Sequence, residues 1–118
     1  MSSPYQHVPA EIVPELASAI KPYVLLIYKK GPNYNSPDKQ KIIQGEHLPY
    51  VFDLRHRGIM SMAIPVMEPE SEVAAIGIYN ITDKEEITRF VQQDPGVQKG
   101  LFTYELLNCM GMKGDTLG

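Results

Sequence analysis

The chain contains one cysteine, no tryptophan and no long uninterrupted run of apolar residues. Because Cys109 is alone, no disulfide can form within the chain, and we expect a buried structural thiol in a reducing compartment. No apolar run approaches the ~20 residues of a membrane-spanning helix, and the N-terminal stretch lacks the basic residues that open a secretory signal. We therefore expect a cytoplasmic protein that is neither exported nor anchored in a membrane.

Positive charge and metal-binding patterns are also scarce. The 11 Lys and Arg residues do not balance the 14 Asp and Glu residues, which gives a net charge of -3. Nucleic acid and anionic membranes attract positive charge, so neither is an expected partner. The histidines His7, His47 and His56 lack the spacing of metal ligands. The sequence has no glycine-rich phosphate loop and no nucleophile motif, so we expect no metal and no cofactor.

At 118 residues the chain is long enough for one domain with a hydrophobic core. Its composition predicts three segments. Residues 1–22 contain four prolines and form an N-terminal arm, residues 23–110 form the folded domain, and residues 111–118, with three glycines, form a flexible tail. The arm carries apolar residues at helical spacing, namely Ile12, Leu16 and Ile20. We expect these side chains to pack on the domain or on a second copy of the chain.

The hydrophobic pattern predicts alternating strands and helices within the domain. They are a strand at 23–28, a helix between 36 and 58, strands at 59–64 and 73–81, a helix that begins after residue 82, and a strand at 101–109. Ser36 is the expected N-cap of the first helix, and Thr82 with Glu85 forms the expected capping box of the second.

This order of elements predicts an α+β fold, the ferredoxin-like β-α-β-β-α-β arrangement. Such a fold places both helices on one face of a four-stranded antiparallel sheet and leaves the other face bare. The first predicted strand, YVLLIY at 23–28, is apolar on both faces, so the bare face needs a cover. We predict a homodimer in which two such sheets pack against each other.

A histidine occupies an apolar position of the first predicted helix. Ile43, Tyr50 and Leu54 recur at helical spacing. His47, four residues after Ile43, completes the same stripe. A regular helix therefore directs the imidazole of His47 toward the interior.

Pro49 conflicts with an uninterrupted helix in this region. Proline removes one backbone hydrogen bond, and its ring clashes with the carbonyl four residues earlier, which belongs to Gly45. Either the helix kinks near His47, or it begins close to Glu46.

An acidic residue stands where the second predicted helix ends. Asp94 lies in Gln93-Asp94-Pro95-Gly96, a sequence typical of a turn. Histidine is the side chain best suited to move protons near neutral pH, and a carboxylate within about 3 Å can hold its ring in one tautomer. His47 and Asp94 are therefore our candidate catalytic pair. The alternative for His47 is a core or surface histidine with no catalytic role. The alternative for Asp94 is a carboxylate that only stabilises the turn and the helix end.

Residues 23–109 resemble the YCII-related (YciI-like) domain family of the dimeric α/β barrel superfamily. The resemblance depends on three motifs: Glu46-His47-Leu48, Arg57-Gly58-Ile59, and the stretch QDPGVQKGL from Gln93 to Leu101. The last motif is the most specific, because Asp-Pro, Val and Gly-Leu directly precede the final strand. The resemblance implies a dimer in which His47 and Asp94 form the active-site pair.

The family resemblance also implies an activity. The few members with an assigned activity carry out proton-transfer chemistry on small cyclic or aromatic compounds, such as dehydrochlorination. Our leading hypothesis is a cofactor-independent enzyme, lyase-like or isomerase-like, in which His47 moves a proton to or from a small-molecule substrate and Asp94 orients the imidazole. The alternative is a non-catalytic ligand-binding or interaction module of the same fold. The sequence Ala63-Ile64-Pro65, where many members have Ala-Gly-Pro, leaves the substrate open.

Overall fold

A four-stranded antiparallel sheet forms the centre of the protein, which a computed structural model describes for residues 6–118. The strand order is β2-β3-β1-β4, and each neighbouring pair is antiparallel. The strands are β1 (Ile20–Lys30), β2 (Met60–Pro65), β3 (Val73–Tyr79) and β4 (Phe102–Met112). The predicted ferredoxin-like α+β fold is confirmed.

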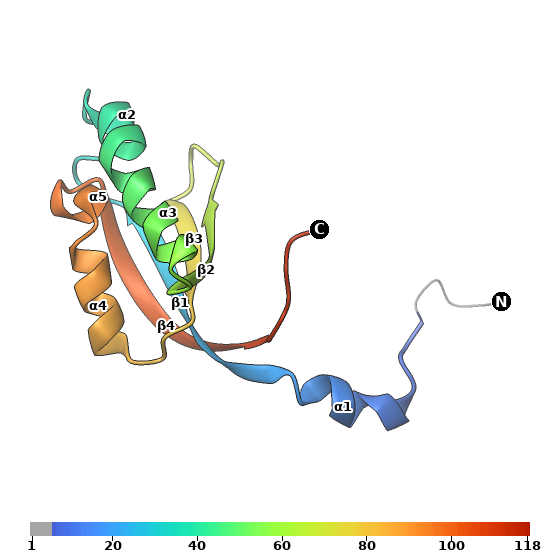
Figure 1. Cartoon of the computed structure of the whole chain (residues 1–118). Coiled ribbons are helices and arrows are strands. Elements are labelled where there is room, and N and C mark those ends of the chain that lie inside the picture. Colours follow the sequence, from blue (N-terminus) through green and yellow to red (C-terminus); the bar gives the residue numbers. More distant parts are fainter. Residues whose placement is uncertain (1–5) are drawn as a thin grey trace.

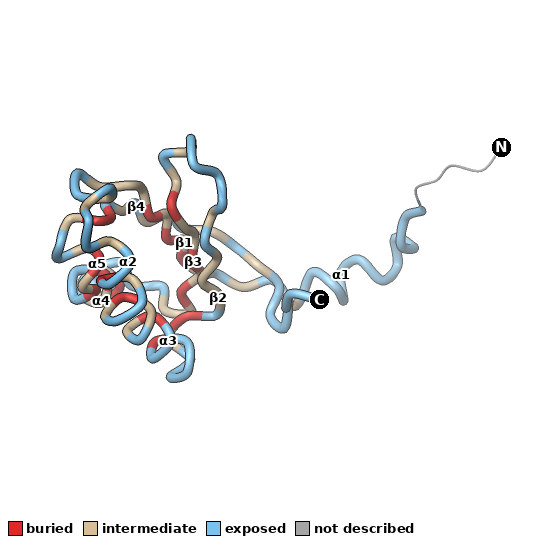
Figure 2. Tube along the Cα trace, turned by 90° about the horizontal axis from the view of Figure 1, so that it is seen from above, coloured by how far each residue is buried: buried red, intermediate tan, exposed pale blue. Residues whose placement is uncertain are grey.

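The helices of the domain lie together on one face of this sheet (Figure 1). They are α2 (Lys39–Ile42), the π-helical turn η2 (Ile43–His47), α3 (Leu48–His56), α4 (Lys84–Gln92) and α5 (Pro95–Gln98). The buried residues gather between the sheet and these helices (Figure 2). None of the helices within residues 6–118 has the length and apolar content needed to cross a membrane.

Strand β1 shows why one sheet face is the core. Val24, Leu26 and Tyr28 point toward the helices and are at most 5% exposed. Leu25 and Ile27 point to the opposite face and are half-buried. Strand pairing places further apolar side chains beside them, and we call the whole set the open sheet face: Leu25, Ile27, Met62, Ile64, Ile76, Ile78 and Leu107. No helix of the described chain covers this face (Figure 2).

The first predicted helix forms as three consecutive segments, from Lys39 to His56. Pro49 is placed in the first turn of α3, directly after the π-helical turn, in which the N–H of Leu48 donates to the carbonyl of Ile43. This wider turn accommodates Pro49, which has no N–H to donate. The predicted start near Glu46 is therefore wrong, because helical turns already begin at Lys39.

The helix caps differ from the predicted ones by one or two residues. Asp38 rather than Ser36 precedes α2, and the Ser36 hydroxyl instead accepts a hydrogen bond from the Asp38 N–H at 3.3 Å. Helix α4 is capped by Asp83, whose Oδ1 accepts from the N–H of Glu85 at 2.9 Å. The prediction of Thr82 as that cap is therefore wrong, although the helix itself is confirmed.

Strands β1 and β4 are longer than predicted because they extend each other. Ile20 pairs with Met112 and Lys21 with Gly111, so the first two residues of the predicted tail belong to β4. The same pairing moves the last residues of the predicted arm into β1. The boundaries of the folded domain therefore lie further out on both sides than the hydrophobic pattern indicated.

The N-terminal arm projects away from the domain (Figure 1). It forms η1 (Ala10–Ile12) and α1 (Val13–Ala17), and its helix ends before Ile20 because that residue already belongs to β1. Ile12 is 39% exposed and Leu16 is 44% exposed. The prediction that the arm packs on its own domain is therefore wrong, and packing on a second copy stays a prediction.

Candidate functional site

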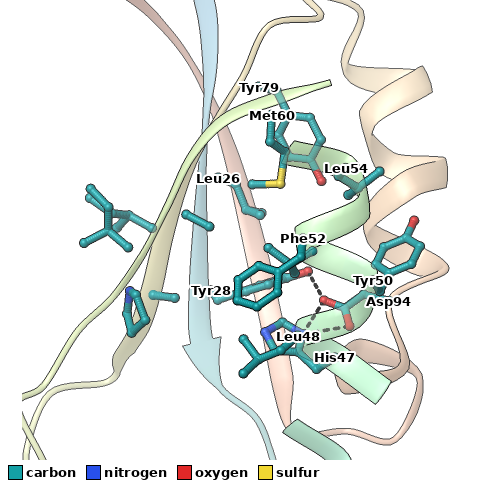
Figure 3. A pocket seen from close by; sticks show the side chains of 16 residues that line it. Leu26, Tyr28, His47, Leu48, Tyr50, Phe52, Leu54, Met60, Tyr79 and Asp94 are labelled. Atoms are coloured by element: carbon teal, nitrogen blue, oxygen red, sulfur yellow. Dashed lines mark hydrogen bonds and ion pairs between the residues drawn. The ribbon is translucent and has the colours of Figure 1, made fainter. Parts of the chain in front are cut away.

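His47 and Asp94 lie next to each other in the core, although the sequence separates them by 47 residues. His47 is the last residue of η2, and Asp94 is the N-cap of α5. The Nδ1 atom of His47 lies 2.8 Å from Oδ2 and 2.9 Å from Oδ1 of Asp94 (Figure 3). His47 is 8% exposed and Asp94 is fully buried. The structure therefore brings together the two candidate residues in a contact that is largely shielded from solvent.

Tyr28 is a third member of the site, and the sequence analysis did not identify it. Its hydroxyl donates to Oδ2 of Asp94 at 2.7 Å, while the N–H of Gly96 donates to Oδ1 at 2.9 Å. The buried carboxylate therefore has a protein donor at each oxygen in addition to His47. The available signal was the polar tip of a tyrosine on the inward face of an apolar strand, because a buried tyrosine hydroxyl usually has a partner.

These contacts determine which nitrogen of His47 is free. Nδ1 faces both carboxylate oxygens, so we assign its proton to the hydrogen bond with Asp94. Nε2 has no hydrogen-bond partner among the described residues and keeps some accessible surface. Because His47 lines a cavity, Nε2 is the nitrogen available to a bound molecule.

The cavity lies between the sheet and α3 and has a volume of about 360 Å³. Its walls are mostly apolar and include Leu26, Leu48, Phe52, Leu54 and Met60. His47 and Asp94 supply a polar end (Figure 3). A cavity of this size with a few polar groups at one end is typical of a small-molecule site.

Burial keeps the tyrosine hydroxyls around the cavity protonated at neutral pH. Burial, followed by the charge of Asp94 and the hydrogen bond to it, raises the pKa of Tyr28 above its ordinary range. Burial, and then the charge of Asp94, raises the pKa of Tyr50 to about 12. Burial is also the main reason that the pKa of Tyr79 is raised. All three tyrosines can therefore act as hydrogen-bond donors.

An aromatic cluster holds the imidazole against the carboxylate. The Phe102 ring stacks on Tyr28 at a centroid distance of 4.9 Å and contacts the His47 ring at 4.9 Å with a 50° tilt. Gly96 makes room for this cluster, because a Cβ atom there would lie 2.7 Å from the Phe102 ring and 3.2 Å from Nδ1 of His47. Close approach of α5 to the imidazole therefore requires glycine at this position.

Replacing Gly96 with alanine is expected to lower the free energy of unfolding by about 1–3 kcal/mol, because the added methyl group overpacks the aromatic cluster. Urea denaturation measures this change. Gly45→Ala is the matched control, since a Cβ atom at Gly45 has no heavy atom within 4 Å. In the helical turn η2 that substitution is expected to be neutral or to stabilise by about 0.5–1 kcal/mol. Equal stabilities for the two variants would contradict the packing argument.

The remaining residues considered as ligands do not form a second site. His7 and His56 are exposed and lie outside the cavity. Within residues 6–118 no group of three or more His, Cys, Asp or Glu side chains is arranged to hold a metal ion.

Comparison with known proteins identifies the fold. No protein-family model and no curated protein matches the chain. The structure is similar to 5-chloro-2-hydroxyhydroquinone dehydrochlorinase from Burkholderia phenoliruptrix AC1100, solved in complex with 2,5-dihydroxybenzoquinone, with a TM-score of 0.52, 19% identity, and coverage of 71% of this chain and 90% of that chain. It also matches protein Atu4242 from Agrobacterium tumefaciens with a TM-score of 0.40, 13% identity, and coverage of 77% and 91%. The first similarity supports the ferredoxin-like α+β fold described above, and at this identity it shows the fold alone.

Proposed function

We propose that this protein is a small cofactor-independent enzyme in which His47 moves a proton to or from a small cyclic or aromatic substrate and Asp94 orients the imidazole. The observation that carries the proposal is the contact between His47 and Asp94 at 2.8 Å, buried at one end of a mostly apolar cavity. An exposed pair of this kind usually contributes little to stability and needs no function. A pair shielded from solvent, with one imidazole nitrogen free, is arranged for proton transfer.

The proposed chemistry follows from the charges in the site. The lone pair of Nε2 takes a proton from a hydroxyl group or a ring carbon of the substrate, and the resulting imidazolium is stabilised by the Asp94 carboxylate. The proton then returns to another atom of the substrate, which gives isomerisation, or the substrate loses an anionic leaving group, which gives elimination. Tyr28 and Gly96 keep the carboxylate in place throughout, because they donate to its two oxygens.

Two further points support a ring-shaped substrate. The motifs around His47 and Asp94 resemble those of the YCII-related family, for which proton transfer on cyclic compounds is implied. The dehydrochlorinase with a similar fold was solved with 2,5-dihydroxybenzoquinone, which is a six-membered ring. The apolar walls of the cavity, with Phe52 and Leu26 among them, suit the faces of such a ring.

The direct test is to incubate the protein with 5-chloro-2-hydroxyhydroquinone and to measure chloride release against a protein-free blank. Enzymatic release is the expected result. If no chloride is released while 2,5-dihydroxybenzoquinone binds in calorimetry, and His47→Gln abolishes that binding, the protein is the non-catalytic ligand-binding module instead. If neither turnover nor binding is seen, the cavity does not serve this class of compound.

We also infer that the open sheet face forms a homodimer interface. Its apolar side chains come from all four strands, and no helix of the described chain covers this face in the single chain (Figure 2). Contiguous apolar surface of this kind usually marks an interface. The exposed apolar residues of the arm, Ile12 and Leu16 among them, would gain cover on the partner copy.

Replacing Ile27 with aspartate is expected to convert this dimer into a monomer at micromolar concentration, because an unpaired charge in an apolar interface is strongly unfavourable. Light scattering measures the mass. Met67→Asp is the matched control, because Met67 is 86% exposed in a loop outside the sheet and its replacement should leave the dimer intact. A monomeric unsubstituted protein would refute the proposed dimer.

A further inference from the structure

Tyr79 places a second polar group in the cavity, away from His47 and Asp94. The residue lies at the end of β3 and is 1% exposed. Its hydroxyl has no hydrogen-bond partner among the described residues. The oxygen keeps some accessible surface, and because Tyr79 lines the cavity, we place this surface at the cavity. In Figure 3 the hydroxyl projects from the sheet toward α3, near Leu54 and Met60.

The two other tyrosines that line the cavity differ from Tyr79 in this respect. The Tyr28 hydroxyl donates to Asp94 at 2.7 Å, and the Tyr50 hydroxyl donates to the carbonyl of Phe90 at 2.6 Å. The Tyr79 hydroxyl has no partner among the described residues and borders the cavity, so it is free to donate a hydrogen bond to a molecule bound there. Phenylalanine would fill the same space but could not donate. The hydroxyl of Tyr79 is therefore best explained by a partner that arrives with a ligand.

Strand register separates the two polar ends of the cavity. Tyr79 pairs with Val24 of β1, whereas Tyr28 lies four residues further along the same strand. This places their backbones about 13 Å apart along β1. Leu26 lies between them on the same face. A ligand that reaches both ends therefore has an apolar middle and a polar group on each side.

We propose that the Tyr79 hydroxyl donates a hydrogen bond to an oxygen of the ligand, on the side of the ring opposite the group that His47 deprotonates. The ligand class is then a six-membered ring with oxygen substituents on opposite carbons, as in hydroquinones and quinones. This inference rests on the proposed function of the His47 end. The raised pKa of Tyr79, caused mainly by burial, keeps its hydroxyl a donor at neutral pH.

The test compares two probes that differ by one oxygen. Hydroquinone and phenol are titrated under argon into the unsubstituted protein, Tyr79→Phe and Tyr50→Phe, and the Kd values are measured by calorimetry. Hydroquinone is expected to bind the unsubstituted protein about tenfold more tightly than phenol, because one more hydrogen bond is made. Tyr79→Phe is expected to remove this difference. Tyr50→Phe should keep it, because the Tyr50 hydroxyl is bound to the Phe90 carbonyl.

Thermal unfolding without ligand supplies a second readout. Tyr79→Phe is expected to leave Tm unchanged or to raise it, whereas Tyr50→Phe is expected to lower Tm because it removes the hydrogen bond that the Tyr50 hydroxyl donates to the Phe90 carbonyl. A lower Tm for Tyr79→Phe would show that the hydroxyl has a structural partner and would overturn the inference.

The binding results separate the two proposals. If His47→Gln abolishes hydroquinone binding but the preference for hydroquinone over phenol persists in Tyr79→Phe, the role of Tyr79 is overturned and the proposed function stands. If the unsubstituted protein binds neither probe, both the ring-shaped substrate and the role of Tyr79 are overturned.

Discussion

Replacing His47 with glutamine is expected to lower the turnover of 5-chloro-2-hydroxyhydroquinone about 10³-fold, because general acid–base catalysis by one side chain typically contributes 10²–10⁴-fold. A glutamine amide can donate to Asp94 in place of Nδ1, but it cannot accept and return a proton. The fold should persist, and thermal unfolding checks this. Chloride release gives the rate.

His56→Gln is the matched control for this experiment. His56 is the last residue of α3 and is exposed to solvent, so its replacement should leave turnover unchanged. If His47→Gln keeps its rate within about tenfold of the unsubstituted protein while remaining folded, His47 is not the proton-transfer group.

The order of strands and helices could be predicted because each element carries its own hydrophobic period. The ends of β1 and β4 could not, because they depend on pairing between distant segments. Pro22 interrupts the apolar pattern of β1, and proline is disfavoured inside a sheet. In the structure Pro22 pairs with Met110 of β4, while β3 begins its pairing with β1 at Val24. Pro22 therefore has a neighbouring strand on one side only, and its missing N–H is tolerated there.

The conformation around Pro49 shows a second limit of the sequence. The local pattern identified a conflict between proline and an uninterrupted helix but offered a kink or a later start. The structure uses a π-helical turn at Ile43–His47, which keeps His47 directed into the core. A sequence window does not distinguish these outcomes, because the choice depends on contacts such as those of His47 with Asp94 and Phe102.

The pairing of His47 with Asp94 was predictable in outline because each residue breaks a local pattern. His47 occupies an apolar helical position, and Asp94 occupies a turn directly after a helix. Tyr28 and Tyr79 break no pattern, since tyrosine is common in strands. Their roles emerge from strand register and from a partner 66 residues away in the case of Tyr28. Those relations are tertiary, so the sequence shows at most a tyrosine hydroxyl on an apolar strand and does not show its partner.

Replacing Asp94 with asparagine is expected to reduce turnover about 10³-fold and to lower the free energy of unfolding by about 1–3 kcal/mol. The Asp94 side chain is fully buried and accepts hydrogen bonds from the Gly96 N–H and the Tyr28 hydroxyl. An amide NH₂ in place of one oxygen is itself a donor, so it cannot accept the hydrogen bond made to that oxygen. It also favours the His47 tautomer whose proton is on Nε2, and that nitrogen can then no longer take a proton from the substrate.

Two comparisons make this prediction specific, with chloride release as the rate measurement and urea denaturation as the stability measurement. Asp53→Asn is the control, because Asp53 is a half-exposed residue of α3 whose ion pair with Arg57, at 3.3 Å, contributes little to stability. The double variant His47→Gln, Asp94→Asn should be about as slow as His47→Gln alone, because groups that act as a unit do not contribute additively. Rate losses that multiply in the double variant would show that the two residues act independently, and the proposed pair would then have to be abandoned.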